Sequence, residues 1–313
     1  MAILAPSRGA ARPLDVTGTL PYVSTMLDLL ERWIARSVTP DRLDWYRRAV
    51  QTVRDGARLS DLGRAIGLAP RTLGRGDLIV TDHERREADA LRPGFDPTGL
   101  SIDQAARIGF VLASYKSDES FAQTVETLCR TADLQELLCY YRGLAVFPAP
   151  ALLRARASEG LRSAIRPVFE AVAHRNPYPR EMLDDAAWNQ MVLKALFIGS
   201  TLFPIQGLDE RANPELAEIL IDYAHERWAA GRPVSLELWR CVGPFAGDRA
   251  LQDMERVLAT GAREERAAVL LALDASSHPR AREMIANSTD LKGLALRGWA
   301  DLIFATRSEQ NSV

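Results

Sequence analysis

Apolar residues recur at intervals of three and four positions along nearly the whole chain, and alternating β-branched runs are almost absent. A period near 3.6 is typical of amphipathic α-helices, whereas a half-buried strand alternates. The pattern predicts helices over the ranges 22–37, 42–55, 59–66, 84–90, 102–114, 119–130, 133–145, 149–174, 185–199, 214–230, 236–241, 248–258, 264–273, 279–286 and 291–305. The sequence therefore predicts an all-α protein.

The predicted helices are joined by short loops, which favours antiparallel packing of neighbours. The last three resemble a HEAT-like hairpin, although no period of 40 to 47 residues holds through the chain. We therefore expect one domain over 1–313, an irregular helical solenoid or HEAT-like α-α superhelix. The glycine- and proline-rich loop 74–99 is the candidate boundary between a possible N-terminal helical subdomain (20–75) and the main helical body (100–306).

Composition and charge exclude several classes of partner. Hydrophobic residues make up 47% of the chain and the formal net charge is -2, so the protein has no field that would gather nucleic acid or an anionic membrane. The longest apolar run, 191–203, is interrupted by Lys194 and is too short to span a bilayer. The N-terminus does not match a secretory signal, and the three cysteines have no CxxC spacing, which favours a reducing compartment. We expect a cytoplasmic protein with no membrane insertion and no nucleic-acid partner.

The predicted helix 185–199 has one strongly apolar face, and Asn189 falls inside it. A buried amide without partners would cost roughly 1–3 kcal/mol, so Asn189 must be hydrogen bonded. Two interpretations stay open: a bond between this helix and another helix or loop, or an amide that lines a ligand pocket. Lys194, on the narrow polar strip, is either solvated or a charged pocket wall.

The helix 214–230 has a well-defined beginning, because Asn213 is an N-cap residue followed by proline. Arg227 projects between two leucines of its apolar face, which predicts an inward-directed guanidinium. A buried guanidinium needs a carboxylate or several carbonyl groups as partners. Asp209 and Asp184 are the candidates within this segment, and an acidic group on a ligand is the alternative.

Motifs for metal binding and cofactor binding are weak. Asp222 and His225 have the i, i+3 spacing of carboxylate-bridged metal sites, but no second motif of this kind accompanies them. Gly74 and Gly76 follow no predicted strand and lack the rest of a dinucleotide fingerprint. We predict no metal and no cofactor.

Four segments of the chain resemble the EboA family: NPYP at 176–179, WNQMVLKA at 188–195, GLDERAN at 207–213 and DYAHERWAAGR at 222–232. Members of this family are encoded beside a prenyltransferase, a sugar-phosphate-cyclase-like enzyme, metal-dependent hydrolases and a TIM-barrel protein. These bacterial gene clusters are tied to the movement of metabolites toward the periplasm. The resemblance implies a role in metabolite trafficking, and it implies no reaction and no catalytic residues.

Our main hypothesis is a non-catalytic helical binding or accessory protein in bacterial secondary-metabolite processing or trafficking. Its partner would be a small metabolite or a protein of the same gene cluster. The candidate ligand-binding residues are the polar groups of the central segment, namely Asn189, Lys194, Asp209, Arg211, Asn213 and Arg227. The alternative is an enzyme of unknown class acting on a small anionic or aromatic metabolite, with Asp209, His225 or Glu226 transferring protons.

Overall fold

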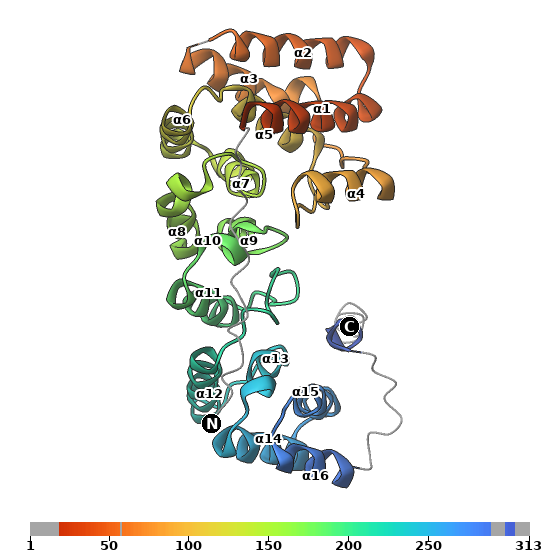
Figure 1. Ribbon diagram of the computed structural model, residues 1–313, viewed down its shortest axis with the longest axis vertical. Coiled ribbons are helices and arrows are strands. Elements are labelled where there is room, and N and C mark those ends of the chain that lie inside the picture. The colour runs from red at the N-terminus through yellow and green to blue at the C-terminus, as the bar shows by residue number, and fades with distance from the viewer. Residues whose placement is uncertain (1–18, 57, 289–297, 304–313) are drawn as a thin grey trace, which may run out of the picture. The chain divides into compact units, whose positions relative to one another are not determined.

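The computed structural model describes residues 19–56, 58–288 and 298–303 (Figure 1). Its secondary structure over these ranges is helical, apart from one isolated antiparallel bridge between Asp77 and Ser101. The all-α fold predicted from periodicity is confirmed. The chain divides into two compact units, and the first ends at Leu183 while the second begins at Asp184. The solenoid and the division at the loop 74–99 stay predictions.

Unit 1 contains the helices α1 (Thr19–Ser37), α2 (Pro40–Arg54), α3 (Leu59–Thr72), α4 (Asp82–Leu91), α5 (Ile102–Ala113), α6 (Asp118–Thr131), α7 (Leu134–Gly143), η1 (Pro150–Leu153), α8 (Arg154–Arg162), α9 (Arg166–Ala173) and α10 (Tyr178–Met182). Unit 2 contains α11 (Asp185–Phe197), α12 (Pro214–Ala229), α13 (Leu238–Val242), η2 (Gly243–Phe245), α14 (Asp248–Thr260), α15 (Arg263–Asp274) and α16 (Pro279–Asn287). The predicted helix 291–305 lies outside the described residues, apart from 298–303.

The core of unit 1 is built around α5, which packs against α1, α2, α3 and α7. Every residue of α5 except Gln104 is buried, as expected for a helix that is apolar nearly all round. Gly109 allows the closest approach, because a Cβ atom at this position would lie 2.3 Å from the Tyr46 hydroxyl oxygen. A glycine is therefore required where the tyrosine ring of α2 crosses α5.

The prediction of one helix over 149–174 is wrong. The structure has three shorter helices there: the 3-10 helix η1, which runs directly into α8, and α9, which begins after the backbone leaves the helical conformation at Ser163 and Ile165, with ψ of 139° and 105°. Ala149, the residue before η1, takes a left-handed conformation with φ of 54°. Pro167 stands in the first turn of α9, where the backbone N–H that proline lacks would have no partner within the helix. In the interior of one long helix, the same proline would remove a hydrogen bond. Helix α10 was not predicted.

The described residues include no helix that combines the length and the apolar character needed to cross a membrane. All three cysteines, Cys129, Cys139 and Cys241, are free and buried. Burial disfavours the thiolate and raises the pKa of each thiol to about 12. These cysteines therefore stay protonated and act as small apolar side chains.

Candidate functional site

Asn189 and Asn213 form a reciprocal amide pair in unit 2. Asn189 is 1% exposed, and its Nδ2 donates to Asn213 Oδ1 at 3.2 Å while Asn213 Nδ2 donates to Asn189 Oδ1 at 2.8 Å. Asn213 Oδ1 also accepts from the Leu216 backbone N–H at 2.9 Å, which is the predicted N-cap of α12. The buried amide therefore has the partner that its position required, and the pair fastens the start of α12 to α11.

Arg211 holds the loop before α12 against α11. Its Nη2 donates to Asp185 Oδ1 at 2.5 Å, and its guanidinium carbon lies 4.8 Å from the centre of the Trp188 ring. The ring is fully buried and the arginine side chain is 17% exposed, so this cation–π contact is largely shielded from water. The contacts of Arg211 are thus made within the protein.

The two carboxylate partners predicted for Arg227 are wrong. The side chain is half-buried, and its Nε donates to the Pro233 carbonyl oxygen at 3.0 Å instead of pairing with a carboxylate. Of the two proposed partners, Asp209 pairs with Arg240 through two contacts of 2.6 Å, and Asp184 caps α11. Arg227 stands in the last turn of α12, and its long stem reaches the chain that follows the helix rather than the core. Lys194, another of the candidate ligand-binding residues, is half-buried on α11.

The polar face of α12 contacts α14. His225 Nε2 lies 2.8 Å from one carboxylate oxygen of Asp253, and Arg249 donates to Asp222 at 2.6 Å. Over the part of the chain that the structure describes, no group of three or more histidine, cysteine, aspartate and glutamate side chains is suited to a metal. Asp222 and His225 each contact a side chain of α14.

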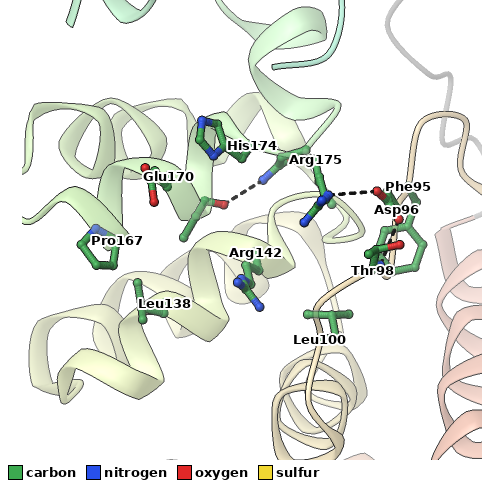
Figure 2. Close-up of a pocket in the computed structure, with 13 residues that line it drawn as sticks. Phe95, Asp96, Thr98, Leu100, Leu138, Arg142, Pro167, Glu170, His174 and Arg175 are labelled. Atoms are coloured by element: carbon green, nitrogen blue, oxygen red, sulfur yellow. Dashed lines mark hydrogen bonds and ion pairs between the residues drawn. The ribbon is translucent and has the colours of Figure 1, made fainter. Parts of the chain in front are cut away.

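A cavity of about 260 Å³ lies in unit 1, away from the residues predicted from the sequence. Three segments form it: the loop 95–100, the end of α7 with the residues after it, and α9 with the residues after it (Figure 2). Its apolar lining consists of Phe95, Leu100, Leu138, Ala145, Pro167 and Ala171. Its polar lining consists of Asp96, Thr98, Arg142, Glu170, His174, Arg175 and Asn176.

Arg142, in the last turn of α7, ties the loop 95–100 to the helix. Its Nη1 donates to the Gly99 carbonyl oxygen at 2.7 Å and to Gln104 Oε1 at 2.8 Å. Gly99 has φ of 78°, a left-handed conformation that glycine adopts without a steric cost. This backbone conformation presents the carbonyl group to Arg142.

Arg175 lies across from the loop 95–100, and Figure 2 shows it turned toward Asp96. The Nε atom of Arg175 is 3.5 Å from Asp96 Oδ2, and Asp96 Oδ1 accepts from the Thr98 backbone N–H at 2.9 Å. Arg175 has φ of 49°, which is uncommon for a residue other than glycine. The sharp turn after α9 thereby directs the guanidinium toward the cavity.

Asn176 lines the cavity, is 2% exposed and joins three elements. Its Nδ2 donates to the carbonyl oxygens of Tyr141 at 3.2 Å and Ala171 at 3.4 Å, and its Oδ1 accepts from the Tyr178 N–H at 3.0 Å. The asparagine therefore fixes α7, α9 and α10 relative to one another, as a buried amide with several partners can.

Sequence reasoning missed the polar residues of this cavity. Arg142 looks like an ordinary cation at the end of a helix, where it would interact with the helix dipole. A signal was present in the run from His174 to Asn176, where three polar residues separate a helix from a proline. The sequence provides no reason to connect this run with Arg142 or Asp96, because both residues lie more than 30 positions before it and periodicity reports only local structure.

The fold and the cavity define an all-helical protein whose first unit encloses a small, partly polar cavity. The chain belongs to the EboA family: the family model described as "Metabolite traffic protein EboA" matches residues 26–243. The matched range includes the cavity and the six residues predicted from the sequence, and it confirms the family resemblance. No curated protein and no solved structure matches the chain.

Proposed function

We propose that the chain is a non-catalytic helical binding protein in metabolite trafficking, and that a small metabolite occupies the cavity of unit 1. The observation that carries this proposal is a cavity of about 260 Å³ that is lined by both apolar and polar side chains. Ligand sites in proteins commonly combine these features. The family description supports the trafficking role.

Binding suits this cavity better than proton transfer does. Asp96 faces Arg175 at 3.5 Å, and Glu170 pairs with Arg166 at 2.7 Å. A general base must take up a proton from the substrate, whereas these carboxylates are engaged with guanidinium groups. The contacts favour a role in holding a ligand.

The test is native mass spectrometry of the protein taken from the producing cell. Leu138→Trp would fill the cavity, because Leu138 lines it. Leu134→Trp is the matched control, since Leu134 is exposed one helical turn earlier on α7. We expect the wild type and L134W to retain a small molecule that L138W loses. Retention by L138W at the wild-type level would show that the ligand lies elsewhere.

A second candidate function is the binding of a partner protein on unit 2. Phe197, at the end of α11, is 74% exposed, which is unusual for so large an apolar side chain. It stands three residues after Lys194, so this proposal keeps part of the segment predicted from the sequence. Phe197→Ser should reduce co-purification of proteins from the same gene cluster, and an unchanged yield would argue against this surface.

We also propose that the protein acts in the cytoplasm. The support is its three free, buried cysteines, which fit a compartment where thiols stay reduced. Fractionation of the producing cell tests this location, and recovery of the protein with the periplasmic contents would contradict it.

A further inference from the structure

We propose that the cavity of unit 1 selects ligands that carry a carboxylate group, and that Arg142 binds this group. The inference rests on the proposed function, because it assumes that the cavity is a small-molecule site. It adds the chemical class of the ligand and the residue that recognises it.

The hydrogen bonds of Arg142 leave one edge of its guanidinium open. Both N–H groups of Nη1 are used, by the Gly99 carbonyl oxygen at 2.7 Å and by Gln104 Oε1 at 2.8 Å. Nε and Nη2 make no hydrogen bond to the described part of the chain, yet neither is a fully buried atom without a partner. They therefore keep access to solvent. Their N–H bonds form the fork that matches the two oxygens of a carboxylate.

Of the two arginines that the described residues place in the cavity lining, Arg175 has a carboxylate partner and Arg142 does not. Asp96 is paired with Arg175 at 3.5 Å and Glu170 with Arg166 at 2.7 Å, whereas no ion pair joins Arg142 to a carboxylate of the described residues. Burial, with a smaller contribution from Arg175, lowers the pKa of Arg142. An anionic group in the cavity would offset this cost of burying the charge.

Carboxylate and phosphate ligands both fit a guanidinium fork, and the cavity favours a carboxylate. Asp96 and Glu170 also line it, so a phosphate with two negative charges would meet more repulsion than a carboxylate with one. The apolar lining from Leu100, Leu138 and Ala171 suits an uncharged body attached to the carboxylate.

Arg142 also anchors the loop 95–100, and this structural role must be separated from recognition. A lysine can donate to both Gly99 and Gln104, but it has no planar fork for a carboxylate. Arg142→Lys therefore keeps the charge and the anchor while removing the proposed binding geometry. Arg154→Lys, at an exposed position at the start of α8, is the matched control.

The experiment titrates the full-length protein with benzoate, benzamide and phenyl phosphate, with the methyl NMR signals of Leu100 and Leu138 as reporters. We expect benzoate to bind about tenfold more tightly than benzamide, and R142K to reduce the affinity for benzoate by a similar factor. R154K should bind benzoate as the wild type does. The comparison of benzoate with benzamide needs no variant, so it tests the inference even if R142K does not fold.

Three results would overturn the inference. Equal binding of benzamide and benzoate would remove the role of charge but leave the proposed small-molecule site intact. Phenyl phosphate binding about tenfold more tightly than benzoate would show that the ligand class is wrong. If no probe shifts the reporter signals while native mass spectrometry still shows a retained metabolite, the carboxylate inference fails and the proposed function stands. If no metabolite is retained either, the proposed function fails as well.

Discussion

The amide pair of Asn189 and Asn213 predicts an asymmetric response to mutation. Asn213 has other partners, because its Oδ1 accepts from Leu216 and its Nδ2 donates to the Arg211 carbonyl oxygen at 3.1 Å. Asn189, which is 1% exposed, has side-chain hydrogen bonds to Asn213 alone among the described residues. Removal of one member is therefore not equivalent to removal of the other.

The magnitudes follow from the groups left without partners. Asn189→Leu removes two hydrogen bonds between neutral groups, a loss of about 1–2 kcal/mol, and Asn213 keeps its remaining partners. Asn213→Ala removes the cap of α12 and leaves the buried Asn189 amide unpaired, which together cost about 2–4 kcal/mol. In N189L/N213A no amide is left unpaired, so we expect a cost of about 1–2 kcal/mol, well below the sum of the single effects.

Native-state hydrogen exchange measures these effects in unit 2, since the core amides of α11 and α12 report the free energy of opening of that unit. Val192 and Leu220 are suitable reporters because both are buried and helical. The decisive result is that the double variant is more stable than N213A. Additive losses, or a larger loss in N189L than in N213A, would refute the explanation that an unpaired buried amide dominates the cost.

Two further predictions concern unit 1. Gly109→Ala places a Cβ atom 2.3 Å from the Tyr46 hydroxyl oxygen and should lower the unfolding free energy by about 1–3 kcal/mol in thermal denaturation. Tyr46→Phe, which removes a buried hydroxyl without a partner, should restore at least part of this loss, and failure to do so would show that the contact is not the cause. The hydrogen bond from Arg36, supported by those from Thr81, lowers the pKa of Glu84 from 4.5 to about 2, so its stabilisation is complete above pH 4.5 and lost as the pH falls toward 2. Glu84→Gln should flatten the stability profile across this range, and an unchanged slope would contradict the role of this carboxylate.

Local signals predicted the helices best where a cap and a periodic face coincide. Asn213 with the following proline gave the start of α12, and the structure places the N-cap there. The range 149–174 failed because its apolar period continues through Ser163 and Ile165, where the backbone leaves the helical conformation. Periodicity describes which face is buried, but it does not register a single residue that leaves the helical conformation.

The candidate site was less accessible to sequence reasoning than the fold. The polarity of Asn189 correctly indicated a buried hydrogen bond, because burial follows from helical phase alone. The carboxylate partners expected for Arg227 were wrong, since a long side chain can leave the face on which its Cα lies and reach a backbone carbonyl group. Arg142 and Asp96 line the same cavity although they are far apart in the chain, and no local pattern connects them.

The burial of Cys129, Cys139 and Cys241 has a practical consequence for studies of the cavity. A buried thiol with a pKa of about 12 reacts very slowly with maleimides at neutral pH, because almost none of it is thiolate. The native chain therefore needs no cysteine replacements before labelling. Thr98 is exposed and lines the cavity, so Thr98→Cys would provide a single attachment point for a fluorophore at its rim. Such a label would convert occupancy of the cavity into an optical signal in an otherwise native background.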